Sequence, residues 1–185
     1  MKALIAAYKI MIFLHKSFWV KIFHISGFSL SSFKSLTSRC RWTTEVSIVG
    51  KSKMKLGVIE CAPNTRLAST AGGNLIIGNH CYFNRNCTVN SRKQISIGGG
   101  STFGPNVCIF DHDHGFGKNG QTGEFKLGTI EIGENCWIGA GTVILRDTCI
   151  GNNCVIGAGC IVKGIIPDNS LVLMDRQLII KPLHD

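Results

Sequence analysis

The chain has 185 residues, of which 44% are hydrophobic, and a formal net charge of +9. This length allows one domain with a full core and a modest appendage, and the hydrophobic content excludes a disordered chain. The charge is uneven, because residues 1–60 contain ten Lys and Arg against two acidic residues, whereas residues 61–185 contain ten against nine. The basic character therefore belongs to the N-terminal part.

The N-terminal segment, residues 1–23, is apolar and aromatic but is interrupted by lysines. Lys2, Lys9 and Lys16 are seven residues apart, which would place them on one face of a helix. The apolar runs between them are too short to span a bilayer, and no signal-peptide cleavage site follows. Two interpretations stay open: a helix that lies in an anionic membrane surface, and a helix that packs against its own domain. No recognition motif accompanies the basic residues, so nucleic acid is not expected as a partner.

The domain boundaries follow from composition. A Ser-rich, basic linker extends to residue 44, and apolar residues alternate with polar ones after it. We expect residues 1–44 to form an N-terminal segment and linker, residues 45–170 a single domain, and residues 171–185 a C-terminal extension.

Regular six-residue steps begin in the middle of the chain. They form one set, Ile77, Phe83 and Val89, and a second set in a shifted register, Ile97, Phe103 and Ile109. A loop at residues 92–94 would absorb the shift. The steps then stop until Ile132, and the polar, Gly-rich stretch at residues 111–127 should leave the domain as a surface loop. Such an insertion is where repeat proteins often carry their function.

The strictest repeat covers residues 132–163. Apolar β-branched residues recur there every six residues: Ile132, Ile138, Ile144, Ile150, Ile156 and Val162. A small residue follows each of the first five at the fifth position of the hexad. This period fits neither an amphipathic helix nor a hairpin, but it fits a short strand and a corner, with three units closing a coil of about eighteen residues. We therefore predict an all-β fold, a parallel β-helix with an N-terminal amphipathic helical segment and one protruding loop.

The nine cysteines fit this repeat better than a disulfide framework or a zinc site. Their number is odd, and no C-x-x-C motif occurs. Five of them occupy the small fifth position of a hexad: Cys81, Cys87, Cys136, Cys154 and Cys160. We expect reduced structural thiols in the cytoplasm and no metal.

The order of motifs resembles the sugar O-acetyltransferase branch of the hexapeptide-repeat acyltransferases, which contains the galactoside and maltose acetyltransferases. The motifs are Tyr82-Phe83-Asn84, Gly104-Pro105-Asn106-Val107 with His114 nine residues after the proline, Trp137-Ile138-Gly139-Ala140, and Ile156-Gly157-Ala158-Gly159. The resemblance implies a left-handed β-helix and a homotrimer with active sites between subunits. It also implies that acetyl-CoA donates an acetyl group to a hydroxyl of a sugar or a cell-envelope polysaccharide precursor.

The resemblance assigns roles to several residues. By its spacing from Pro105, His114 would be the general base, and an imidazole suits this task because its ordinary pKa is about 6.5. Asp111 or Asp113 could orient the ring, and the sequence does not decide between them. The candidates for acceptor contact are Tyr82, Asn84 and His112. A metal pair of His112 and His114 is a weaker interpretation, because no third ligand lies nearby in sequence.

The resemblance places the CoA site along the C-terminal coils. The backbone N–H of Ala140 would stabilise the tetrahedral oxyanion. The remaining candidates for cofactor contact are Trp137, Gly139, Gly157 and Ala158, with Lys163 and Arg176 as cations for the phosphates.

Two alternatives remain. The first is an acetyltransferase for an amino sugar or serine, and an amine acceptor would depend less on His114. The second is a non-catalytic β-helix that binds a partner or acts as a scaffold. A metal-dependent relative would need histidines on several coils, and only His80, His112 and His114 lie in the coils and the loop.

Overall fold

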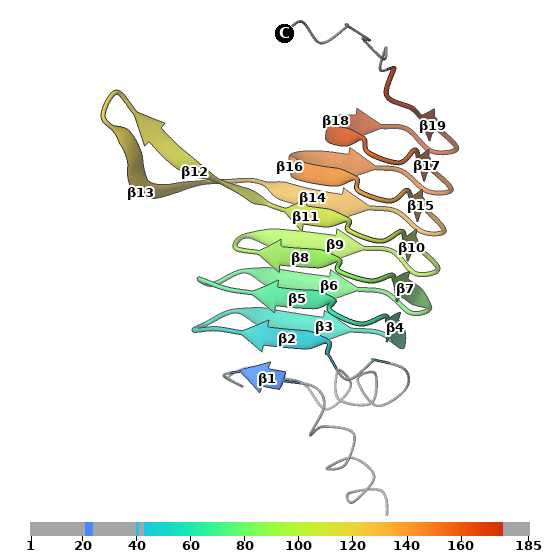
Figure 1. Cartoon of the computed structure of the whole chain (residues 1–185), viewed down its shortest axis with the longest axis horizontal. Helices are drawn as coiled ribbons and strands as arrows, with labels where there is room; N and C mark the ends of the chain where they lie inside the picture. The colour runs from blue at the N-terminus through green and yellow to red at the C-terminus, as the bar shows by residue number, and fades with distance from the viewer. Residues whose placement is uncertain (1–20, 24–39, 41–42, 176–185) are drawn as a thin grey trace, which may run out of the picture.

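The structure, a computed structural model, describes residues 21–23, 40 and 43–175. These residues form short strands stacked as a parallel β-helix, with no helix among them (Figure 1). The strands are β1 (Lys21–Phe23), β2 (Glu45–Ile48), β3 (Lys53–Leu56), β4 (Ile59–Cys61), β5 (Arg66–Ser69), β6 (Asn74–Ile77), β7 (Cys81–Phe83), β8 (Thr88–Ser91), β9 (Gln94–Ile97), β10 (Thr102–Phe103), β11 (Cys108–Phe110), β12 (His112–Gly117), β13 (Gly120–Leu127), β14 (Thr129–Ile132), β15 (Trp137–Ile138), β16 (Val143–Ile150), β17 (Val155–Ile156), β18 (Ile161–Ile166) and β19 (Leu171–Val172).

The coils have three faces of parallel strands. The first face contains β2, β5, β8 and β11, the second contains β3, β6, β9 and β14, and the third contains β4, β7, β10, β15, β17 and β19. The longer strand β16 runs along both of the first two faces, because its start pairs with β11 and its end with β14. Two of the three corners matter below. The corner that we call the Asn84 corner joins the third face to the first; it contains residues 84–87, 104–107 and 139–142. The corner that we call the hairpin corner joins the first face to the second; it contains residues 92–93, 111–128 and 145–147.

The predicted ladder of apolar residues forms the core. All of its members from Ile132 to Val162 are buried, as are the aromatic members Phe83 and Phe103, whose rings stack at 4.5 Å between centroids. Each ladder residue pairs with its counterpart in the next coil; Phe103, for example, pairs with Ile138. The predicted parallel β-helix and its inward ladder are confirmed.

The small fifth position of the hexad lies inside the turn, where its side chain bonds to the next coil. The thiols of Cys81 and Cys87 donate to the carbonyls of Gly98 and Gly104, both at 3.2 Å. Burial raises the pKa of each of these thiols to about 11. They are therefore protonated packing groups at neutral pH, and all nine cysteines are free.

Asparagine occupies several corner positions with positive φ. Asn64, Asn86 and Asn106 stack in successive coils at φ near 60°, and the amide of each of the first two donates to the next side-chain oxygen at 3.2 and 3.1 Å. Asparagine tolerates this left-handed backbone better than most residues. The ladder of amides satisfies the polar side chains along that edge.

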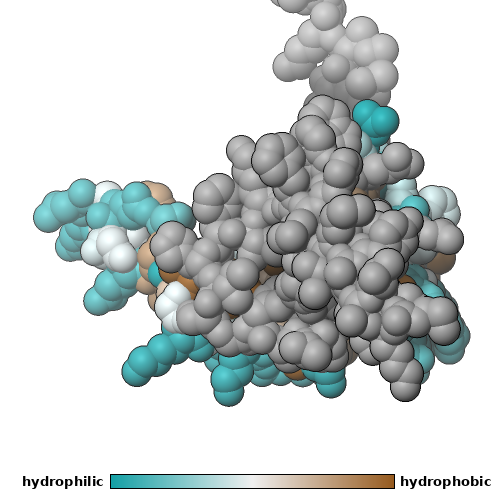
Figure 2. Space-filling view, turned by 90° about the horizontal axis from the view of Figure 1, so that it is seen from below, coloured by the Kyte–Doolittle hydropathy of each residue, from teal (hydrophilic) through white to brown (hydrophobic). Residues whose placement is uncertain are grey.

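The insertion at the hairpin corner has the predicted boundaries but is not a loop. Thirty-five residues separate Thr102 from its register partner Trp137, whereas eighteen separate Trp137 from Val155. The extra residues match the length of segment 111–127, which forms the antiparallel hairpin of β12 and β13. It projects from the coil with a largely hydrophilic outer part (Figures 1 and 2). At its neck, the Gly128 N–H donates to the Asp111 carbonyl at 2.8 Å, so the coil path continues directly past it.

Both ends of the stack differ from expectation. Lys21–Phe23 form strand β1, which pairs with β2, so the helix predicted up to Phe23 is wrong for these three residues. The rest of that prediction falls on residues 1–20, which lie outside the described residues. At the other end, β19 pairs with β17, so the β-helix continues to Val172 rather than ending at residue 170. None of the described residues forms a helix that could cross a membrane.

Candidate functional site

Asp111 lies at the neck of the hairpin with its side chain fully buried. Its carboxylate accepts hydrogen bonds from the Ser91 hydroxyl at 2.8 Å and from the backbone N–H groups of Arg92 and Lys93 at 2.8 and 2.9 Å. The fourth partner is Nδ1 of His112, at 3.0 Å from Oδ1. The carboxylate thus ties the hairpin to the corner between β8 and β9 and holds the ring of His112.

Asp113 and His114 have different partners from those expected. Asp113 accepts a hydrogen bond from Nε of Arg146 at 2.6 Å, which connects the hairpin to β16 in the next coil. His114 is exposed, and its Nδ1 contacts the side-chain amide of Gln121 on the opposite strand. Neither Asp111 nor Asp113 contacts His114 in this arrangement, so the expectation that one of them orients this ring does not hold within the chain.

Arg92 and Phe125 complete the cluster, and no sequence pattern indicated either residue. The Arg92 guanidinium lies 3.6 Å from the centroid of the Phe125 ring. The same ring contacts both imidazoles, with centroid distances of 5.6 Å to His112 and 4.6 Å to His114. Nε of Arg92 is buried without a hydrogen-bond partner. The two histidines therefore both contact the Phe125 ring, and the Arg92 guanidinium lies over a face of the same ring.

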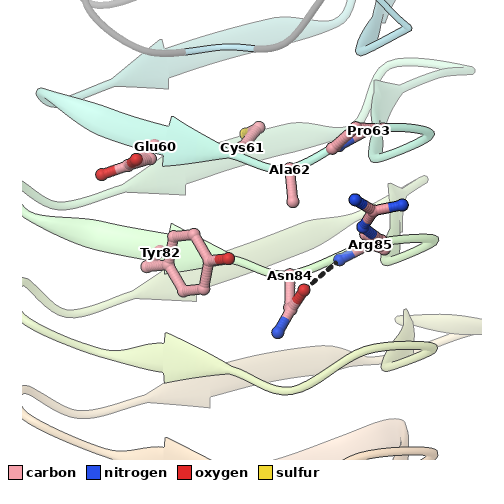
Figure 3. Close-up of a pocket in the computed structure, with 7 residues that line it drawn as sticks. All are labelled: Glu60, Cys61, Ala62, Pro63, Tyr82, Asn84 and Arg85. Carbon is pink, nitrogen blue, oxygen red and sulfur yellow. Dashed lines mark hydrogen bonds between the residues drawn. The ribbon is translucent and has the colours of Figure 1, made fainter.

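A pocket of about 400 Å³ lies at the start of the Asn84 corner (Figure 3). Its lining contains Tyr82 and Asn84, which the sequence predicted as acceptor contacts, and also Glu60 and Arg85, which it did not. Glu60 is the register partner of Tyr82 in the preceding coil, so the coil period was the signal that could have found it. The Asn84 side-chain oxygen accepts the Arg85 backbone N–H at 2.8 Å, which fixes the amide and aims its NH₂ group away from that bond.

The predicted cofactor residues follow the same side of the stack. Trp137 is 58% exposed, and it shares a row with Thr102 and Tyr82 on the third face. At the usual strand spacing it lies about 10 Å from Tyr82. Gly139 is required by the coil itself, because a Cβ there would lie 2.5 Å from the backbone nitrogen of Ala158. The turn after Trp137 thus keeps backbone near the surface, and Ala140 at its tip is exposed.

The remaining predicted residues lie elsewhere. Gly157 and Ala158 form the equivalent turn one coil further on. Lys163 is exposed on β18. The residue before it, Val162, pairs with the first-face part of β16, and the residue after it, Gly164, pairs with the second-face part. Lys163 therefore lies at the hairpin corner and not beside Trp137. Arg176 lies outside the described residues. Within residues 21–23, 40 and 43–175, no group of three or more His, Cys, Asp or Glu side chains could hold a metal ion.

The predicted site residues of a single chain therefore fall into two groups at different corners, which we call the two half-sites. Tyr82, Asn84 and Trp137 lie along the third face and the Asn84 corner, whereas His112 and His114 project from the hairpin corner on the other side of the coil (Figure 1). The first face separates the two. The chemistry expected of these residues needs the half-sites to meet.

Comparison with known proteins connects this arrangement to a family. Residues 129–164 match the family described as bacterial transferase hexapeptide (six repeats). The chain is 36% identical over 118 residues to galactoside O-acetyltransferase of Escherichia coli (strain K12), covering 62% of this chain and 57% of that protein. It is 37% identical over 75 residues to nodulation protein L of Rhizobium meliloti (strain 1021), covering 40% of this chain and 41% of that protein. The chain thus spans about half the length of the curated relatives it matches.

Among solved structures, the N-acyltransferase AntD from Bacillus cereus superposes with a TM-score of 0.55 at 14% identity, covering 71% of this chain and 73% of that one. This likeness concerns the fold alone. The hexads and the match over residues 129–164 show that the chain contains a hexapeptide-repeat region, and its sequence relatives include galactoside O-acetyltransferases.

Proposed function

We propose that the protein is an acetyl-CoA-dependent O-acetyltransferase that acts on a hydroxyl of a sugar or a cell-envelope polysaccharide precursor. The observation that carries this proposal is the polar pocket at the Asn84 corner, which lies on the same side of the stack as Trp137. The sequence similarity to galactoside O-acetyltransferases supports the choice of reaction.

The pocket has the chemistry of a sugar site. Tyr82 offers a ring face and a hydroxyl, Asn84 an amide, and Glu60 and Arg85 two charged groups of opposite sign. Sugars present hydroxyl groups next to apolar ring faces, and such a mixture of donors and acceptors can fix one orientation. Acetyl-CoA would lie along the third face, with its thioester near the turn that follows Trp137.

Assembly as a homotrimer would unite the two half-sites. If the hairpin of one copy lies against the Asn84 corner of the next, an imidazole from one subunit meets the pocket and the turn of another. The hairpin's length and its projection away from its own coil support this arrangement (Figure 1). The imidazole would accept the hydroxyl proton during attack on the thioester, and a backbone N–H would stabilise the oxyanion.

The test is an acetyl transfer assay with the whole chain, acetyl-CoA and a panel of hydroxyl sugars, amino sugars and serine, read by mass spectrometry of the products. We expect O-acetylated sugar, and a loss of transfer in Asn84→Ala without a change in the melting temperature. Transfer only to amines or serine would replace the acceptor class, and no acetyl transfer at all would refute the reaction. Light scattering of the same sample should give a trimer, and full activity from a monomer would refute the shared site.

A further inference from the structure

We propose that Cys40 and Cys61 form a reversible dithiol–disulfide site, which a hydroperoxide oxidises so that a covalent bond locks the first coil of the β-helix. The first coil is the one that contains β2, β3 and β4. This inference goes beyond the proposed acetyl transfer and does not depend on it, because the bond can be measured without any acceptor.

The two cysteines occupy a position of the coil that is otherwise large and apolar. Cys61 pairs in register with Phe83, and the column continues through Phe103. On its other side Cys61 forms a parallel bridge with Cys40, which packs against the core. The five cysteines at the small fifth position of the hexad bond instead to backbone carbonyls of the following coil. The packing role of those five therefore does not explain this pair.

The placement of the pair suits a disulfide. Neighbouring strands lie about 5 Å apart, which is within the range of Cα separations that a disulfide can bridge. The two thiols already contact each other through a side-chain hydrogen bond. Both are free in this structure, which therefore shows the reduced form of the pair. Oxidation needs only a closer approach of the two sulfurs.

The shared hydrogen bond makes the two thiols chemically unequal. It lowers the pKa of Cys40, whereas the same bond and burial raise the pKa of Cys61 well above its ordinary value. A thiolate can only accept, so Cys61 keeps its proton and donates it to the Cys40 sulfur. Cys40 is also partly exposed, whereas Cys61 is buried. Because the thiolate is the nucleophilic form, Cys40 is the attacking sulfur and Cys61 the resolving one.

The oxidation balances with a hydroperoxide as the only co-reactant. The Cys40 thiolate attacks one oxygen of hydrogen peroxide, so a sulfur–oxygen bond forms, the O–O bond breaks, and the leaving hydroxide takes the proton that Cys40 had released. The Cys61 sulfur then attacks the sulfenic acid. The sulfur–sulfur bond forms, the sulfur–oxygen bond breaks, and the second hydroxide takes the Cys61 proton. The products are one disulfide and two waters, and a dithiol reductant reverses the change.

The bond would hold the end of the stack, where support is weakest. Among the described residues, β3 and β4 are the last strands of their sheets at this end. A terminal coil packs against one neighbouring coil rather than two, so it opens more readily than a central one. The disulfide would close the first coil into a covalent ring. Because Glu60 and Cys61 line the pocket at the Asn84 corner, the lock would also hold one wall of that pocket in place (Figure 3).

The first experiment treats the whole chain with hydrogen peroxide, blocks the remaining thiols with N-ethylmaleimide and identifies bonded cysteines by peptide mass spectrometry. We expect an intramolecular Cys40–Cys61 disulfide that dithiothreitol reverses. Cys40→Ser should abolish it. The matched control, Cys81→Ser with Cys87→Ser, should leave it unchanged, because these thiols bond to carbonyls of other coils. Cys61→Val keeps an apolar side chain in the column, so it removes the second sulfur while preserving the fold.

Three results would overturn the site. Oxidation of Cys40 to sulfinic acid with Cys61 still free would show that the second thiol does not reach the first. A disulfide through the exposed Cys149 or the partly exposed Cys108 would assign the oxidation to the surface. A Cys40 thiol that survives peroxide unchanged would remove the attacking group.

Hydrogen exchange measured by mass spectrometry tests the lock itself. We expect oxidation of the wild type to slow exchange in β2 and β4 by about tenfold or more and to leave β15 and β17 unchanged. Peroxide-treated Cys40→Ser should exchange like the reduced wild type. Equal exchange in the oxidised and reduced wild type would overturn the lock. A failure of acetyl transfer would leave both results standing, because neither experiment contains an acceptor.

Discussion

The C-terminal coils and the hairpin use their hydrogen-bonding groups in opposite ways. In the coils, backbone groups bond from one turn to the next in a repeating pattern, as the Gly139 N–H does with the Ile156 carbonyl at 2.7 Å. In the hairpin, Asp111 and Asp113 each have partners that occur once in the chain, at Arg92 and Arg146 respectively. Repetition gives stability that depends on neighbouring coils only, whereas single contacts position individual side chains. The division predicts that stability and activity respond to different substitutions.

Removing the hairpin should have the largest effect on activity and little effect on the fold. With residues 112–127 replaced by one glycine, we expect acetyl transfer to fall to background. The coil should remain folded, since the Asp111 carbonyl and the Gly128 N–H already meet at the neck. Circular dichroism and thermal melts would measure the fold. Loss of the β-helix signal would mean that the hairpin is part of the folding unit.

A matched pair of phenylalanines separates the regions by stability. Phe83→Ala in the core should lower the free energy of unfolding by about 4 kcal/mol, because it leaves a cavity beside Phe103. Phe116→Ala should change it by less than about 0.5 kcal/mol, since this hairpin side chain is 73% exposed. Denaturant titrations of both variants would give the difference. Equal losses would contradict the view that the hairpin is energetically separate.

The buried thiols predict a weakness of the coils at alkaline pH. The pKa of Cys81 and of Cys87 is about 11, above the ordinary value of 9.0, so the folded chain holds these protons more tightly than the unfolded chain. Stability is therefore complete below about pH 9 and falls as the pH rises towards 11. The expected loss is about 1.4 kcal/mol per thiol per pH unit, or about 3 kcal/mol for the two at pH 10.

A serine pair provides the control for this alkaline effect. Ser101 already occupies the position that follows Cys81 in the stack, and its hydroxyl donates to the Gly133 carbonyl at 2.9 Å. The variant with Cys81→Ser and Cys87→Ser should fold at pH 7.5 and show a shallower decline above pH 9. An unchanged decline in urea titrations at pH 8, 9 and 10 would attribute it to other groups.

The smallest effect concerns the N-terminal segment, which we propose contacts an anionic membrane surface on the cytoplasmic side. Replacing Lys2, Lys9 and Lys16 by Gln removes at most about 1 kcal/mol of attraction each. Salt screens this attraction over about 8 Å at physiological strength, so we expect a loss of about tenfold in vesicle binding. Sedimentation with anionic and neutral vesicles would measure it. Binding that ignores both the lysines and the lipid charge would favour packing against the domain.

The sequence was sufficient for the coils because their information is periodic. Ile132 to Val162 repeat one environment, so a count of residues predicts both the strand and the direction of each side chain. The site was harder to predict, since its contacts come from residues distant in sequence. Asp111 lies about one coil after Ser91, Arg92 and Lys93, and nothing in their spacing indicates that one carboxylate accepts from all three. Spacing from Pro105 selected His114, and nothing in that spacing indicates that Asp111 contacts the ring of His112.

The neck of the hairpin also suggests how such a protein could have arisen. Because the chain leaves and rejoins the coil at one backbone hydrogen bond, seventeen residues can enter an existing turn without shifting the register of any later strand. A single insertion event would then be enough to supply both histidines and the projecting hairpin. Descendants could exchange that segment for another of different length while inheriting the same stack, so differences in chain length between relatives should be concentrated between Asp111 and Gly128.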